Sequence, residues 1–124
     1  IDEFPLLFIV ASIIKGVSKF SGINELRYKE SDRIKNVEIG LKQIGIKTKS
    51  TPDSLTIFGN PKVKVKKKLK IFSKKDHRIA MSFFCLGQLL EGDVEISNFE
   101  TVKTSFSKFL LTMKKIGATY EIKK

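Results

Sequence analysis

The sequence predicts an α/β fold in which two copies of one unit follow each other, each with the order helix, strand, helix, strand. Apolar runs at residues 5–14 and 79–90 have the length of a helix and end shortly before Gly16 and Gly92, which lie 76 residues apart. A segment with period-two alternation follows each run, which is typical of a strand. A second amphipathic helix then follows in both halves.

The first half of the chain supplies these elements in order. After the apolar helix, residues 17–23 alternate as a strand does. The next helix ends at Gly45 and has apolar residues at helical spacing: Ile34, Val37, Leu41 and Ile44. Residues 46–50 and the segment 51–60 then predict two strands joined by a Pro-Asp turn.

The second half repeats this order. Residues 93–99 predict a strand, and the helix after it ends at Gly117, 72 residues after Gly45. Its apolar positions are Phe106, Phe109, Leu110, Met113 and Ile116. Residues 118–124 predict a terminal strand. The repeat units are therefore residues 1–60 and 76–124.

A basic connector, residues 61–75, joins the two units. Its alternating valines and lysines favour a solvated strand or sheet edge, because lysine blunts an edge. No aromatic residue interleaves it before Phe72, whereas a platform for single-stranded nucleic acid needs aromatic side chains. The helices at 5–14 and 79–90 are apolar nearly all round, so we expect them to be central and buried, with the sheets outside.

Composition limits the classes of function. The 124 residues carry a net charge of +11, from 21 lysines, three arginines and 13 acidic residues. A basic nucleic-acid-binding module is one alternative, and a lysine-rich genome is another. No apolar run reaches about 18 residues, and no secretory signal opens the chain, so we expect a cytoplasmic protein without a membrane segment. The single cysteine, Cys85, excludes an internal disulfide and a cysteine-built zinc site, and we expect it to be a packed core thiol.

Basic side chains at predicted helix N-termini indicate an anionic ligand. Lys29, Arg33 and Arg78 lie at such termini, where the helix dipole disfavours cations by roughly 0.3–1 kcal/mol each. Nearby acids and hydroxyls are ordinary N-caps: Ser31, Asp32, Asp76, Thr104 and Ser105. The repeat predicts that these termini lie on one side of the domain. A phosphate or carboxylate bound there would make the electrostatic interaction of the basic side chains favourable. Two further carboxylates, Asp2 and Glu30, are candidates for proton transfer at the same place.

Two motifs carry a resemblance to a known family. The run L-R-Y-K-E-S-D-R at 26–33 and the run D-H-R-I-A-M-S-F at 76–83 resemble the 5-enolpyruvylshikimate-3-phosphate synthases. The segments D-E-F-P-L-L at 2–7 and T-S-F at 104–106 are similar to the flanking segments of that family. The resemblance implies two domains of three related α/β units each, of which this chain looks like the last two units of the C-terminal domain. The start on Ile1 agrees with a fragment of a longer protein.

The resemblance also implies a reaction and its residues. Members transfer the enolpyruvyl group of phosphoenolpyruvate to the 5-hydroxyl of shikimate 3-phosphate and release phosphate, without a metal or organic cofactor. The resemblance implies that Asp2 is a general base that also binds shikimate 3-phosphate and that Glu30 transfers a proton. It implies that Lys29 binds shikimate 3-phosphate and that Arg33 and Arg78 bind phosphoenolpyruvate. His77 has a supporting role, and Lys103 is a weakly matched phosphoenolpyruvate contact.

The same resemblance sets expectations for partners and alternatives. The missing N-terminal domain supplies further contacts, so the fragment alone is expected to be inactive and the full-length protein monomeric. A related transferase that acts on a UDP-linked amino sugar is the alternative within the class, although K-E-S-D-R and D-H-R favour shikimate. Arg27 lies beside these motifs and is either a ligand contact or the partner of Glu25 or Glu30 in a surface ion pair, of which we favour the ion pair.

Overall fold

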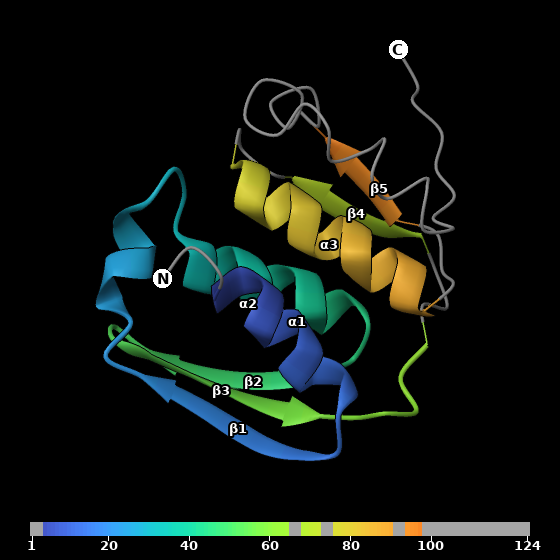
Figure 1. Ribbon diagram of the computed structural model, residues 1–124, viewed down its shortest axis with the longest axis horizontal. Coiled ribbons are helices and arrows are strands. Elements are labelled where there is room, and N and C mark those ends of the chain that lie inside the picture. The colour runs from blue at the N-terminus through green and yellow to red at the C-terminus, as the bar shows by residue number, and fades with distance from the viewer. Residues whose placement is uncertain (1–3, 65–67, 73–75, 91–93, 98–124) are drawn as a thin grey trace.

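The computed structural model describes residues 4–64, 68–72, 76–90 and 94–97 (Figure 1). The elements in chain order are α1 (Phe4–Ile13), β1 (Gly16–Ser21), the 3-10 helix η1 (Asn24–Tyr28), α2 (Arg33–Gln43), β2 (Lys47–Thr51), β3 (Ser54–Gly59), β4 (Leu69–Phe72), α3 (His77–Leu90) and β5 (Val94–Ser97). This order confirms the predicted elements of the first unit and the first helix and strand of the second. The predicted helix over Phe106 to Ile116 and the strand at 118–124 lie outside the described residues.

The first sheet is antiparallel, with the strand order β1-β3-β2. Strands β2 and β3 form a hairpin in which Thr51 pairs with Ser54, so Pro52 and Asp53 make the turn that the sequence predicts. The inner face of β3 is apolar, because Leu55 and Ile57 are fully buried. This face therefore packs on the helices, and the sheet forms one outer layer of the molecule.

The second sheet pairs β4 with β5 in parallel, with Leu69 opposite Val94. Strand β4 lies inside the segment that the sequence analysis treats as a solvated connector. Its residues alternate between the core and solvent, because Leu69 and Ile71 are buried whereas Lys70 is exposed. The expected strand is therefore confirmed at residues 69–72, but it is half-buried rather than solvated.

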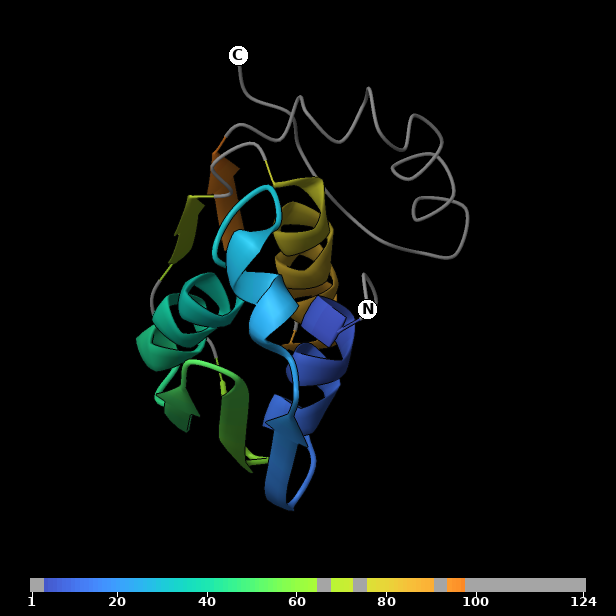
Figure 2. The same cartoon turned by 90° about the vertical axis from the view of Figure 1, so that its left-hand side faces the viewer.

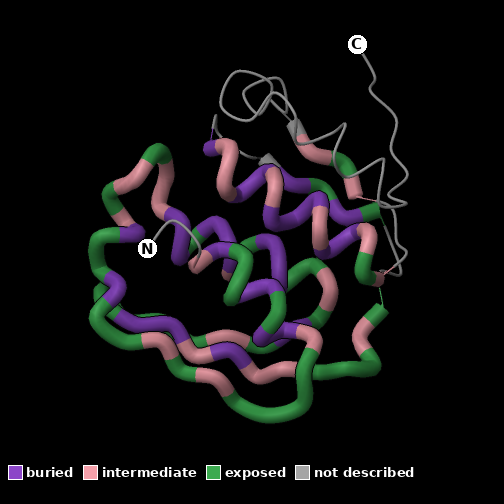
Figure 3. Tube along the Cα trace, in the orientation of Figure 1, coloured by how far each residue is buried: buried purple, intermediate pink, exposed green. Residues whose placement is uncertain are grey.

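The three helices lie together between the two sheets (Figures 1 and 2). Helix α1 contacts α2, α3 and β3, α2 packs on β2, and α3 packs on β4 and β5. The burial trace in Figure 3 places most buried positions on the helices and on β3. This arrangement confirms central helices with sheet on the outside. The fully buried apolar side chains at its centre include Phe8, Ile9, Leu26, Ile34, Val37, Leu41, Leu55, Ile57, Ile79, Phe83 and Leu86.

One side of α1 departs from the expectation that this helix is buried all round. Phe8 and Ile9 face the core, whereas Leu6, Leu7 and Val10 are 46%, 47% and 41% exposed. Helices α2 and α3 and the first sheet cover only part of the α1 surface among the described residues. An apolar sequence alone therefore overestimates the burial of this helix, because burial also depends on what packs against each side.

The close approach of α2 and α3 depends on Gly40. A Cβ atom at this position would lie 2.2 Å from Cζ and 2.5 Å from Cε1 of the buried Phe83 ring. Gly40→Ala is expected to lower the free energy of unfolding by about 1–3 kcal/mol, the typical effect of overpacking. Thermal unfolding of the full-length protein measures this. The double variant Gly40→Ala/Phe83→Leu, which removes both clashing atoms, should be more stable than Gly40→Ala; the opposite order would contradict this packing.

Candidate functional site

The described helices α1, α2 and α3 all begin on the same side of the molecule (Figure 1). The repeat predicts this, and for these three helices it is confirmed. The backbone N–H groups of each first turn have no partner within the helix and favour negative charge nearby. The side chains at the starts of α2 and α3 therefore define the candidate site.

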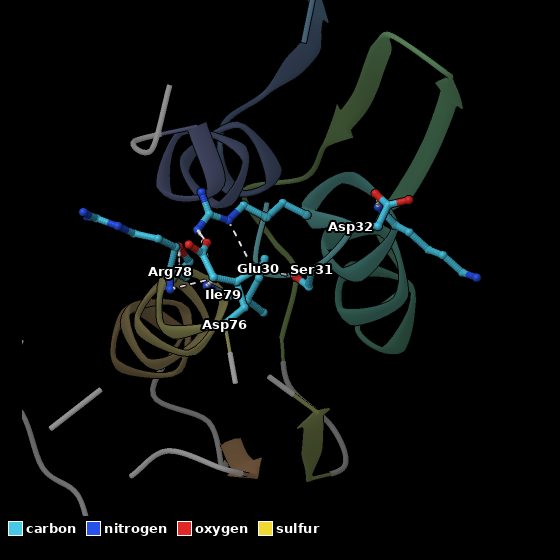
Figure 4. Close-up of polar contacts among 9 residues, drawn as sticks. Glu30, Ser31, Asp32, Asp76, Arg78 and Ile79 are labelled. Carbon is cyan, nitrogen blue, oxygen red and sulfur yellow. Dashed lines mark hydrogen bonds and ion pairs between the residues drawn. The ribbon is translucent and has the colours of Figure 1, made fainter. Parts of the chain in front are cut away.

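A buried ion pair joins the starts of α2 and α3 (Figure 4). Arg33, the first residue of α2, is 1% exposed, and Asp76, directly before α3, is fully buried. Arg33 donates from Nε to Asp76 Oδ2 at 3.0 Å and from Nη2 to Asp76 Oδ1 at 3.2 Å. Two parallel bonds of this kind fix the plane of the guanidinium as well as its position.

Asp76 also organises the backbone around it. Its Oδ1 accepts from the amide of Arg78 at 3.1 Å and from that of Ile79 at 3.4 Å, so Asp76 caps α3 as the sequence predicts. Its Oδ2 accepts from Ser31 Oγ at 2.6 Å. From the sequence, Ser31 and Asp76 are expected only to cap helices. The structure adds a second role, because the buried Arg33 needs a carboxylate and Asp76 provides it.

Glu30 lies on the outer side of the same cluster. Its carboxylate contacts Nη2 of Arg33, while the Glu30 side chain stays 51% exposed. Arg33 therefore lies between a buried carboxylate and a half-exposed one. The expectation that Arg33 requires a bound anion to offset the helix dipole is incomplete, because the protein's own carboxylates provide that charge.

Three other candidate side chains are partly exposed: Lys29, His77 and Arg78. Among the described residues, none of these three side chains forms a hydrogen bond or an ion pair. Figure 4 shows the Arg78 side chain leading away from the Asp76 carboxylate. Lys29 and Arg78 are therefore cations that remain available to a ligand beside the Arg33 cluster. Asp2 and Lys103, the remaining candidates, lie outside the described residues.

Arg27 has a structural role. Its Nη1 lies 3.1 Å from Asp32 Oδ2, and it donates to the backbone oxygens of Thr51 and Pro52 at 2.6 Å and 3.1 Å. Asp32 in turn caps α2 by accepting from the amide of Lys35 at 3.0 Å. The expected surface ion pair is confirmed, but Glu25 and Glu30 are wrong as its partners. This arginine ties η1 to the β2–β3 turn.

Cys85 lies on α3 and is only partly buried, less than the expected core thiol. Burial raises the pKa of its thiol above the usual value, so little thiolate forms at neutral pH. Among the described residues, no three His, Cys, Asp or Glu side chains are grouped closely enough to hold a metal ion.

In the described part of the chain, three exposed lysines share one face of the first sheet, because Lys19 and Lys49 both pair with Thr56 and Lys47 lies two residues from Lys49. The exposed lysines lie on several elements: Lys19 on β1, Lys35 and Lys42 on α2, Lys47 and Lys49 on β2, and Lys70 on β4. In the part of the chain that the structure describes, no helix is both long enough and apolar enough to cross a bilayer.

Comparison with known proteins identifies the family. The family model described as EPSP synthase (3-phosphoshikimate 1-carboxyvinyltransferase) matches residues 1–113. The 3-phosphoshikimate 1-carboxyvinyltransferase of Zymomonas mobilis is 42% identical over 98% of this chain and 28% of its own length. That of Persephonella marina is also 42% identical, over 94% of this chain and 26% of its own length.

A solved structure agrees with these sequences. The EPSP synthase of Acinetobacter baumannii superposes with a TM-score of 0.90 at 40% identity and covers 98% of this chain. The match spans 28% of that structure, so the chain corresponds to about a quarter of its relatives' length. The resemblance that the K-E-S-D-R and D-H-R motifs carry is thus confirmed along nearly the whole chain. The chain belongs to the EPSP synthase family.

Proposed function

We propose that the complete protein containing this chain transfers the enolpyruvyl group of phosphoenolpyruvate to the 5-hydroxyl of shikimate 3-phosphate and releases phosphate. The observation that carries the proposal is the cluster at the starts of α2 and α3. There a fixed arginine, Arg33, lies beside a half-exposed carboxylate and near two cations without a protein partner among the described residues. Family membership supplies the reaction.

The proposed binding roles follow from charge. Phosphoenolpyruvate carries a carboxylate and a phosphate, and arginine binds such groups through paired N–H donors. We assign Arg33 and Arg78 to phosphoenolpyruvate, Lys29 to the phosphate of shikimate 3-phosphate, His77 to support and Lys103 to a weaker contact. Arg33 is 1% exposed, so the bound carboxylate takes the place of Glu30 at Nη2.

The proposed proton transfers use two carboxylates. The 5-hydroxyl oxygen attacks C2 of phosphoenolpyruvate and loses its proton to Asp2, while the methylene carbon accepts a proton from Glu30. The tetrahedral adduct then loses phosphate as the methyl group returns a proton, which restores the double bond. Once the substrate has displaced Glu30 from Arg33, the Glu30 carboxylate takes up a proton from solvent, gives it to the methylene carbon, and takes a proton back from the methyl group in the elimination. The fixed cations hold the carboxylate and phosphate in place while charge moves.

The rest of the proposed active site comes from outside this chain. The relatives are nearly four times longer than the matched region, and we assign the remaining substrate contacts to the N-terminal domain that they include. The chain alone is therefore expected to bind weakly and to be inactive. We further propose a cytoplasmic, monomeric full-length enzyme that needs no cofactor.

The test is a substrate-dependence assay on the full-length protein. Phosphate release is measured with phosphoenolpyruvate alone, with shikimate 3-phosphate added, and with a UDP-linked amino sugar added instead. Release that depends on shikimate 3-phosphate, with the enolpyruvyl ether detected by NMR, supports the proposal. Phosphate release only with the UDP-linked amino sugar would show that the protein is the related transferase. No phosphate release with either acceptor would contradict both activities.

A further inference from the structure

We propose that Asp76 is a positioning residue that sets the relative placement of both phosphoenolpyruvate-binding arginines, an inference that rests on the proposed function. Asp76 is not itself expected to touch a substrate, because its side chain is fully buried. It acts through Arg33 by direct ion pairing and through Arg78 by way of the α3 backbone. Three features of the structure support this role.

The first feature is that Asp76 fixes Arg33. Both carboxylate oxygens accept from the guanidinium, at 3.0 Å and 3.2 Å. Among the described residues, Asp76 is the only acidic side chain that is buried. The Glu30 side chain on the other side is 51% exposed, whereas both side chains of the Arg33–Asp76 pair are buried, so a ligand reaches the Glu30 position first. We therefore expect Arg33 to keep its orientation when a ligand replaces Glu30.

The second feature is that one oxygen serves both arginines. Oδ1 of Asp76 accepts from Nη2 of Arg33 and also from the backbone amide of Arg78 at 3.1 Å. The start of α3, which carries the Arg78 side chain, is therefore anchored to the atom that anchors Arg33. A shift of this carboxylate would change the distance between the two guanidinium groups.

The third feature is the Ser31 hydroxyl. It donates to Oδ2 of Asp76 at 2.6 Å. Ser31 follows Lys29 and Glu30 in the loop between η1 and α2. Through this bond, the segment that carries two other candidate residues is attached to the same carboxylate. Asp76 therefore binds Arg33 and the Arg78 amide directly but reaches the segment of Lys29 only through this one hydrogen bond, so its loss should affect phosphoenolpyruvate more than shikimate 3-phosphate.

The chain contains a matched control for simple capping. Asp32 caps α2 as Asp76 caps α3, and each pairs with an arginine. The partner of Asp32 is Arg27, which lies outside the proposed site. An asparagine at either position keeps an oxygen that can cap the helix but loses the charge. The two substitutions therefore differ in which arginine they release.

The experiment compares full-length wild type, Asp76→Asn and Asp32→Asn by steady-state kinetics and by calorimetric binding of each substrate. We expect Asp76→Asn to raise KM for phosphoenolpyruvate by roughly 10- to 100-fold. This is the typical effect of losing a residue that orients a ligand-binding side chain through hydrogen bonds, as measured for residues behind metal ligands. Affinity for shikimate 3-phosphate should stay within about threefold, which is a small change in free energy. Asp32→Asn should leave both values near those of the wild type.

A milder variant covers the case in which Asp76→Asn does not fold. Ser31→Ala removes only the Oγ–Oδ2 hydrogen bond and should raise KM for phosphoenolpyruvate by about fivefold, the typical effect of one such bond. If Asp76→Asn folds and changes both substrates equally or neither, or if it does not fold and Ser31→Ala has no effect, the positioning role is overturned. An inactive wild type would instead overturn the proposed function, and this inference with it.

Discussion

Asp76→Ala is expected to lower the free energy of unfolding by about 3–5 kcal/mol, the range for removing one partner of a buried ion pair. The physical reason is that Arg33, at 1% exposure, would keep its charge without the carboxylate that now binds it at two points. The loss of the α3 cap acts in the same direction. Urea unfolding of the full-length protein, followed through the transition of this domain, measures the change.

Two comparisons separate the buried pair from the cap. Asp32→Ala removes a cap and an ion pair whose carboxylate is 32% exposed, so it should cost only about 1 kcal/mol. The double variant Asp76→Ala/Arg33→Met removes both buried charges and should recover much of the lost stability. Equal effects of Asp76→Ala and Asp32→Ala would contradict the importance of the buried pair.

Arg78→Ala is expected to separate binding from stability. In the full-length protein it should reduce kcat/KM for phosphoenolpyruvate by at least about 30-fold, because truncating a charge that pairs with a ligand typically costs 2–5 kcal/mol. Binding of shikimate 3-phosphate should change much less. Stability should stay the same or rise by up to about 1 kcal/mol, since a cation at a helix N-terminus opposes the dipole.

Arg27→Ala is the matched control for Arg78→Ala. Arg27 makes one ion pair and two backbone contacts within the fold, so its loss should reduce the melting temperature and leave phosphoenolpyruvate kinetics unchanged. The two arginine variants should therefore show opposite patterns. Unchanged phosphoenolpyruvate kinetics in Arg78→Ala would remove Arg78 from the binding site.

Local sequence signals predict most of the described elements. Helix α2 has apolar residues at helical spacing, the Asp32 cap at its start and Gly45 with φ of +82° after its end. The β2–β3 turn is likewise encoded locally by Pro52 and Asp53. In contrast, the pairing of β4 with β5 depends on strands more than 20 residues apart, and the exposure of α1 depends on its neighbours.

The sequence predicts only part of the site, because contacts between residues far apart in the chain are not visible in it. Cations and carboxylates beside helix starts are visible in the sequence, and the motifs assign them roles. The partner of Arg33 is not visible, because Asp76 is 43 residues away and its capping role already explains an acid at that position. Only the folded structure shows that one carboxylate caps α3, neutralises Arg33 and accepts from Ser31.

The most direct test of the account is a crystal structure of the full-length protein with shikimate 3-phosphate and an unreactive phosphoenolpyruvate analogue. We expect anionic oxygens of the analogue at hydrogen-bond distance, about 2.7–3.2 Å, from the guanidinium groups of both Arg33 and Arg78. Asp76 should retain its two contacts with Arg33, while Glu30 leaves Nη2. An analogue bound away from both arginines, or an Arg33 that has left Asp76 to reach it, would contradict the account.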